Sequence, residues 1–196
     1  MNAVAMIHDS APSEVDDATL ERRFAKGDTE AFEQVVALYQ SRVIRLAGRL
    51  LGWQGGAEDI VQDVFLSAWT KAHTYRGDAP LWNWLTIITV NRCRTHMRRK
   101  AMLSRLTAGL MGRAEEFSPA SDANSLAEES NQRVRAAMAC LPSRDREVTV
   151  LLYLEHRRPA EIATLLEISV NAVNVRLHRA RQKLKVLLED ADGEMS

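Results

Sequence analysis

Hydrophobic residues recur at spacings of three and four along most of the chain, which is the pattern of amphipathic helices. The clearest run follows Asp28, which can cap a helix start, and it ends at Gly52. A second helix is predicted from about residue 57 to 73, and a third begins near Trp82 and ends at Lys100. Because no segment alternates between hydrophobic and polar residues, no strand is predicted.

The C-terminal part is also helical, after a break in composition. Residues 101–130 are rich in Ser, Ala and acidic residues around Pro119, which is typical of a linker, and MLSRLTAGLM leaves room there for a short helix. Beyond this linker, Pro142 ends one helix, Ser143 is placed to cap the next, and Pro159 fits the first turn of another.

The last two predicted helices are separated by only a short turn. A short apolar helix, a turn over residues 167–169 and a longer helix that Ser169 can cap have the spacing of a helix-turn-helix. The predicted fold is all-α, with two small helical domains joined by a flexible linker. The expected parts are a disordered acidic N-terminal extension (1–19), a first helical domain (20–100), the linker (101–130), a helix-turn-helix domain (131–188) and an acidic tail (189–196).

Composition adds few constraints on chemistry. The 196 residues are 46% hydrophobic and hold 26 Lys and Arg against 26 Asp and Glu, as in an ordinary globular protein. The N-terminus lacks a secretion signal and no apolar run could span a bilayer, so we expect a cytoplasmic protein without direct membrane insertion. The two cysteines suggest no disulfide, and Cys93 with His96 lacks two further metal ligands, so no metal or cofactor is expected.

The balanced total hides a strong segregation of charge. Residues 66–113 hold nine Lys and Arg residues against Asp78 alone, and residues 159–185 are basic as well. Acidic stretches flank both zones. Two basic zones suggest two contacts with an anionic partner, most commonly nucleic acid, although an unevenly charged solvated surface gives the same counts.

The last helix has one apolar side and one side suited to DNA. Short amides and arginines near the start of such a helix can contact base edges in the major groove, and later cations can contact phosphates. The alternative is an ordinary amphipathic helix with a polar outer side. The side suited to DNA includes Asn171, Asn174, Val175, His178 and Arg179, with Arg181 at its margin.

The second helix carries large apolar residues beside its polar side. Asp59, Gln62 and Asp63 project away from the apolar stripe, and Leu66 and Trp69 lie next to them. Aromatic anchors surrounded by polar groups favour a protein docking surface. The alternative to a docking surface is that Trp69 is buried under a neighbouring helix.

Aromatic and basic residues occur together in the loop after the second helix and in the third helix. Exposed rings can stack with bases for about 1–3 kcal/mol each while guanidinium groups follow the backbone, which suits an opened DNA strand. Burial of the tryptophans in the core is the alternative. The residues of this pattern include Tyr75, Arg76, Trp82, Asn91, Arg94 and Arg98.

The blocks AEDIVQDVFLSAW, YRGDAPLWNWL, LPSRDREV and EIATLLEISVNAVNVRLHRARQKL, in this order, resemble the bacterial RNA polymerase sigma factors of the extracytoplasmic-function (ECF) group of the sigma-70 family. The resemblance covers roughly residues 20–188. It implies sigma regions 2 and 4, no catalytic activity, and binding to core RNA polymerase and promoter DNA at the -10 and -35 elements. An anti-sigma partner is implied as well. The resemblance assigns Tyr75, Arg76, Asp78, Trp82 and Asn91 to -10 DNA binding, to which the aromatic and basic pattern adds Arg94 and Arg98. It assigns Asn174, Val175, Arg176, His178, Arg179 and Arg181 to -35 DNA binding, to which the outer side of the last helix adds Asn171. For core-polymerase binding it points to Asp59, Gln62, Asp63 and Phe65, to which the docking surface adds Leu66 and Trp69.

Some positions depart from the family pattern. Glu167 stands where many members carry Gly, and Asn174 and Val175 stand where a basic residue and a small hydroxyl residue are common. These changes predict an unusual -35 preference or weaker binding there.

A helix-turn-helix regulator that binds duplex operator DNA without polymerase is the alternative function. The sequence gives no support for an enzyme, since it contains no phosphate-binding loop, dinucleotide-binding glycine motif or metalloprotease motif.

Overall fold

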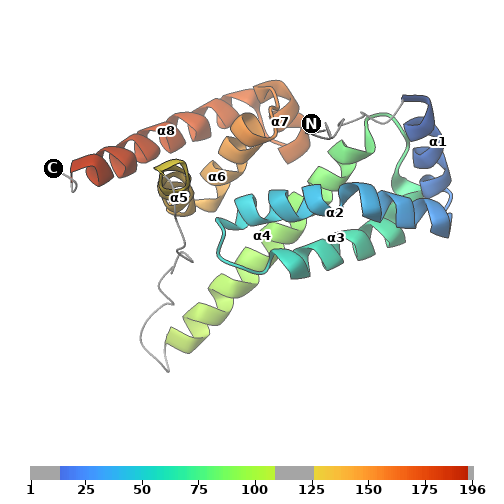
Figure 1. Cartoon of the computed structure of the whole chain (residues 1–196), viewed down its shortest axis with the longest axis horizontal. Coiled ribbons are helices and arrows are strands. Elements are labelled where there is room, and N and C mark those ends of the chain that lie inside the picture. The colour runs from blue at the N-terminus through green and yellow to red at the C-terminus, as the bar shows by residue number, and fades with distance from the viewer. Residues whose placement is uncertain (1–13, 109–125, 194–196) are drawn as a thin grey trace, which may run out of the picture.

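The structure is a computed structural model that describes residues 14–108 and 126–193. These residues form helices and connecting turns, with no strand among them, as the hydrophobic pattern predicted. Figure 1 shows two helical groups, α1 to α4 and α5 to α8, lying against each other. Most of the predicted N-terminal extension, the middle of the predicted linker and the end of the acidic tail lie outside the described residues.

The first group contains four α-helices and one short 3-10 turn. It begins earlier and ends later than predicted: residues 14–19 already belong to the first helix, and the last helix continues past Lys100, because its final residues are mostly good helix formers with no Gly or Pro. The elements are α1 (Glu14–Ala25), α2 (Thr29–Leu51), α3 (Ala57–Lys71), η1 (Ala72–Thr74) and α4 (Leu81–Ala108).

Local chemistry sets the ends of α2 as expected. The Asp28 carboxylate accepts a hydrogen bond from the Ala31 backbone N–H at 3.1 Å, which satisfies one of the free donors of the first turn. At the other end, Gly52 adopts a left-handed conformation with φ 70°, which costs little without a Cβ. The apolar sides of α2, α3 and α4 then pack together around buried residues that include Val35, Leu46, Leu50, Ile60, Val64 and Leu85.

The second group contains the predicted helix-turn-helix. Pro159 opens the first turn of its first helix, and Ser169 caps its second helix by accepting a hydrogen bond from the Ala172 N–H at 3.1 Å. Both predictions are confirmed. The elements are α5 (Leu126–Ala139), α6 (Ser143–Thr149), a π-helical turn η2 (Val150–Leu154), α7 (Pro159–Leu166) and α8 (Val170–Gly193).

The predicted cap at Ser143 is wrong. Ser143 is the first helical residue of α6, and Pro142 occupies the cap position with φ −53° and ψ 140° and no side-chain cap hydrogen bond. Pro142 ends the previous segment because its ring fixes an extended-type turn, and the helix starts directly after it. After Thr149 the helix changes to a π-helical turn that begins at Val150.

The two groups are joined by polar contacts that the sequence pattern did not predict. The buried Arg146 side chain donates from Nε to the Leu50 carbonyl at 2.9 Å, at the C-terminal end of α2. Glu155 accepts a hydrogen bond from Arg49 at 3.0 Å, and Arg157 donates to the Asn83 side chain. These contacts satisfy polar groups that are removed from water where the groups meet, so they fix how the groups are oriented.

Candidate nucleic-acid and partner interfaces

The outer side of α3 carries both polar side chains and a large apolar one. Asp59, Gln62 and Asp63 are exposed, and Leu66 exposes 64% of its surface although it is a large aliphatic residue. No hydrogen bond or ion pair to the side chains of these three polar residues occurs within the described part of the chain. An exposed leucine bordered by free carboxylates on a rigid helix is suited to docking another protein.

Two members of the predicted docking set lie differently from the rest. Phe65 is buried with only 6% of its surface exposed, so it belongs to the core and holds α3 in place instead of facing a partner. Trp69 exposes 37%, and its ring packs on Phe32 with centroids 4.8 Å apart. Trp69 is therefore partly packed against a neighbouring helix and partly exposed, so each of the two alternatives, burial and a docking surface, holds in part.

The loop between α3 and α4 is fixed by a residue of α1. One carboxylate oxygen of Glu21 lies 2.6 Å from the Tyr75 hydroxyl, and the other accepts the Leu81 backbone N–H at 2.8 Å. Burial and this carboxylate raise the pKa of Tyr75 above its usual value, so the hydroxyl stays protonated. Glu21 thus ties both ends of the loop, and local sequence gave no signal for it.

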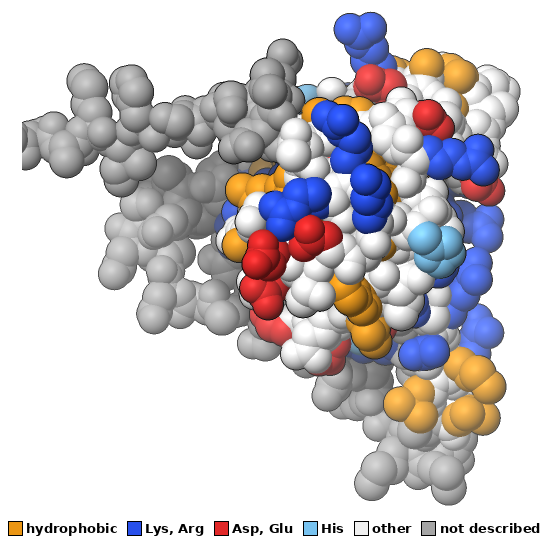
Figure 2. Space-filling model, turned by 90° about the vertical axis from the view of Figure 1, so that its right-hand side faces the viewer, with side chains coloured by type: hydrophobic (Ala, Val, Ile, Leu, Met, Phe, Trp, Pro, Cys, Tyr) orange, Lys and Arg blue, Asp and Glu red, His pale blue; other side chains and the backbone are white. Residues whose placement is uncertain are grey.

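The buried rings correct the expectation of direct stacking at two positions. Tyr75 is buried in the core, and so is Trp82, which stacks on Tyr39 with centroids 6.1 Å apart and lies beneath the Arg42 guanidinium. Neither ring offers a face to a base in this structure, because neighbours from α1 and α2 cover them. Arg76 and Asp78 are exposed in the loop, and Asn91 is exposed on α4. Figure 2 shows this end of the molecule, where basic side chains extend over the top and down the right-hand edge, and acidic ones gather at the left with a few more among the basic ones.

Arg94 of α4 is paired with a residue of the second helical group. It forms two parallel hydrogen bonds to Glu147 of α6, at 2.9 and 2.8 Å, and the Glu147 side chain is 2% exposed. This carboxylate raises the pKa of Arg94. Arg98, one turn further along α4, is exposed. The structure thus separates the two basic candidates on this helix into one that is paired with the second group and one that is accessible.

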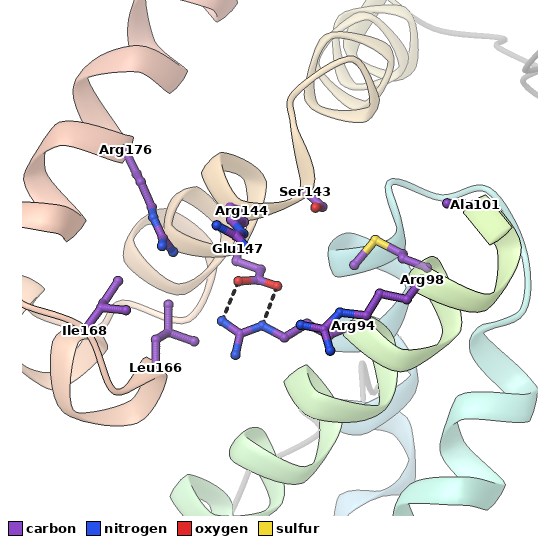
Figure 3. A pocket seen from close by; sticks show the side chains of 10 residues that line it. Arg94, Arg98, Ala101, Ser143, Arg144, Glu147, Leu166, Ile168 and Arg176 are labelled. Atoms are coloured by element: carbon purple, nitrogen blue, oxygen red, sulfur yellow. Dashed lines mark hydrogen bonds and ion pairs between the residues drawn. The ribbon is translucent and has the colours of Figure 1, made fainter. Parts of the chain in front are cut away.

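The outer side of α8 presents most of the predicted reading residues to solvent. Arg179 lies 3.8 Å from Asp145, and Arg181 donates from Nε to the Tyr153 hydroxyl at 2.9 Å. Arg176 differs, since it is half-buried and its Nη1 atom is fully buried without a hydrogen-bond partner among the described residues. Its side chain faces the cleft between the two groups (Figure 3). The exposed members are Asn171, Asn174, Val175, His178, Arg179 and Arg181.

The turn of the helix-turn-helix explains one departure from the family pattern. Glu167 ends α7 in the left-handed region with φ 55° and ψ 46°. A side chain with a Cβ is strained in that conformation, whereas Gly adopts it freely. The turn keeps its shape with Glu, at a cost in stability.

Residues 14–108 and 126–193 include two thiols, Cys93 and Cys140, and other side chains that can bind metal. No group of three or more His, Cys, Asp or Glu side chains suited to a metal ion occurs there. Burial raises the pKa of Cys93 to about 12, so its thiol stays protonated at neutral pH and is a poor nucleophile and metal ligand. Within the same ranges, no helix is long and apolar enough to cross a membrane.

Comparison with known proteins matches both helical groups. The family model Sigma-70 region 2 matches residues 35–102, and the model Sigma-70, region 4 matches residues 131–184. The RNA polymerase sigma factor CnrH of Cupriavidus metallidurans is 31% identical, over 91% of this chain and 96% of its own. The ECF RNA polymerase sigma factor SigW of Bacillus subtilis is 29% identical, over 86% of this chain and 95% of its own.

Solved structures share the fold. The structure of CnrH in complex with the cytosolic domain of CnrY has a TM-score of 0.64 at 28% identity, covering 89% of this chain and 97% of that one. The sigma factor RpoE in complex with the anti-sigma factor NepR from Bartonella quintana has a TM-score of 0.66 at 24% identity, covering 82% and 98%. The two ordered region matches and the relatives aligned over nearly the whole length show that the chain belongs to the ECF group of the sigma-70 family of RNA polymerase sigma factors.

Proposed function

We propose that this sigma factor binds core RNA polymerase through the exposed side of α3 and directs it to promoters through loop 75–80, α4 and α8. The observation that carries the proposal is the side of α3 defined by Asp59, Gln62, Asp63 and Leu66, which is exposed on a helix whose other side is buried. A free carboxylate pair beside an apolar anchor gives both the rate and the specificity of docking to a basic, apolar surface.

DNA recognition is divided between the two groups. The exposed side of α8 would enter the major groove at the -35 element, with its amides and Arg179 at base edges. Arg76, Asp78, Asn91 and Arg98 would hold the opened strand at the -10 element. Strand contacts there have to offset the lost stacking of the duplex, about 1.4 kcal/mol per base step. Polymerase holds both groups on the DNA, so neither group alone needs to bind tightly.

Full use of the -10 surface requires the two groups to separate. Glu147 occupies the Nε–Nη2 edge of Arg94 and holds the guanidinium group against α6, so this edge is not available to a DNA strand while the groups are together. The arrangement described here is therefore proposed to be a resting form. A partner that stabilised it would hold the factor inactive, which is how an anti-sigma factor would act on this chain. RpoE of Bartonella quintana was solved in complex with the anti-sigma factor NepR, and CnrH with the cytosolic domain of CnrY.

The docking assignment is tested by Asp59→Ala combined with Asp63→Ala. We expect association with purified core polymerase to fall about tenfold or more, because two charge-assisted contacts are lost, while far-ultraviolet circular dichroism stays unchanged. Glu33→Ala, an exposed acidic residue on α2, is the matched control and should leave association unchanged. Equal association of the double variant and the wild type in a pull-down would reject the docking surface.

Transcription provides the functional test. Purified core polymerase with this chain, supplied with a pool of genomic fragments, should produce transcripts that share an upstream motif. Tight binding of the chain alone to palindromic duplex sites, with no effect on core polymerase, would instead favour a conventional regulator.

A further inference from the structure

A cleft of about 490 Å³ lies between the two helical groups. Its walls come from α4 on one side and from α6, α7 and α8 on the other (Figure 3). Volumes of about 300–1,000 Å³ are typical of small-molecule sites, and a DNA duplex is too large to enter. The cleft exists only while the groups are together, so a molecule bound in it touches both.

The lining is unusually basic. Arg94 and Arg98 extend into the cleft from α4, Arg144 from α6 and Arg176 from α8, as Figure 3 shows. Glu147 is the only acidic side chain among the described residues that line it, and both of its oxygens accept hydrogen bonds from Arg94. Three guanidinium groups therefore remain without a carboxylate partner in the described part of the chain.

One of these three guanidinium groups, that of Arg176, has a buried donor without a hydrogen-bond acceptor in residues 14–108 and 126–193. The Nη1 atom of Arg176 is fully buried and has no hydrogen-bond partner among the described residues. A buried, unpaired charged donor is costly, and an anion in the cleft would relieve that cost. Apolar residues beside the arginines, including Leu166 and Ile168, would cover the uncharged part of a ligand.

We propose that the cleft between the two groups is a binding site for a small, multiply charged phosphate compound, such as an oligophosphate or a phosphorylated metabolite. Arginine suits such a ligand because its planar group donates two parallel hydrogen bonds to phosphate oxygens. Several arginines from both walls match several negative charges on one molecule.

Binding there has a consequence for regulation, which rests on the proposed function. A ligand that touches both walls binds the closed arrangement and not the open one, so it shifts the population toward the closed form. It also occupies Arg98 and Arg176, which are candidate DNA-binding residues. The ligand is thus expected to oppose promoter binding.

The test is calorimetric titration of the full chain with inorganic tripolyphosphate at constant ionic strength. Constant ionic strength matters because nonspecific surface attraction depends on salt. Arg144→Gln should weaken binding about tenfold, as expected for loss of a charge-assisted contact. Arg99→Gln is the matched control: Arg99 is exposed on α4 next to Arg98 but does not line the cleft, and binding should change less than about twofold.

Three results would overturn the site: no saturable binding of tripolyphosphate, equal weakening by the two variants, or a short duplex oligonucleotide whose binding depends on Arg144 as strongly as that of tripolyphosphate. Circular dichroism verifies that each variant is folded, and Arg144→Lys, which keeps the charge but not the paired donors, should bind with intermediate strength if the site is specific. The titration contains no polymerase and no promoter. Saturable, Arg144-dependent binding by a chain that fails to support transcription would uphold the site and count against the proposed function alone.

Discussion

The ion pair between Arg94 and Glu147 is the contact whose removal should reveal how the two groups are held together. Glu147→Gln keeps the size of the side chain and one carbonyl acceptor but removes the charge. The Glu147 side chain is 2% exposed and that of Arg94 is 28% exposed, so the pair is nearly removed from water. The change therefore weakens a buried charge-assisted contact that bridges residues 53 positions apart in the chain.

The size of the effect can be bounded. Breaking a buried pair by removing one partner costs about 3–5 kcal/mol when the remaining charge stays unpaired. Arg94 lies at the edge of the contact and can regain water when the groups separate, and Gln retains one of the two hydrogen bonds. We therefore expect the closed form to lose about 1–2 kcal/mol relative to the open form, which changes their ratio about 5- to 30-fold.

Small-angle X-ray scattering measures this directly, since separation of the groups raises the radius of gyration. Glu147→Gln should give a larger radius than the wild type, with unchanged helical content. Glu189→Gln is the control, because Glu189 forms an exposed ion pair with Lys185 at 3.7 Å, and surface pairs contribute little. Identical scattering of Glu147→Gln and the wild type, or equal expansion in Glu189→Gln, would refute the reasoning.

Three further predictions follow from local chemistry. Glu167→Gly should stabilise the chain by about 0.5–1 kcal/mol in urea unfolding, because relief of the left-handed strain exceeds the flexibility that Gly adds to the unfolded chain; a lower midpoint would contradict this. Ser169→Ala should cost about 1 kcal/mol through loss of the helix cap, measured in the same way, while Ser169→Asp should restore most of it. A thiol reagent at neutral pH should modify the exposed Cys140 well before Cys93, whose thiol is buried and protonated; equal rates in the folded protein would contradict the burial.

The helical fold and most helix ends could be predicted from the sequence because they depend on nearby residues. Asp28 caps α2 and Ser169 caps α8, each through a hydrogen bond to a residue three positions away, and Pro159 starts α7 because its ring fixes its own backbone φ. The same local logic failed at Ser143, where the preceding proline took the cap position. For the candidate surfaces, helical periodicity correctly separated the exposed Asp59 side of α3 from its buried side.

For the -10 and -35 candidates, the tertiary structure decided which residues are accessible. Tyr75 is covered through Glu21, 54 positions away, and Trp82 is covered by α2, so no local pattern could distinguish an exposed ring from a buried one. Arg94 is paired with a residue of the second group, and Arg176 turns toward the cleft. The sequence by itself determined the helices and their amphipathic sides, because hydrogen bonding and side-chain periodicity within a helix are local. The contact between the groups depends on distant residues that become neighbours only in the folded chain.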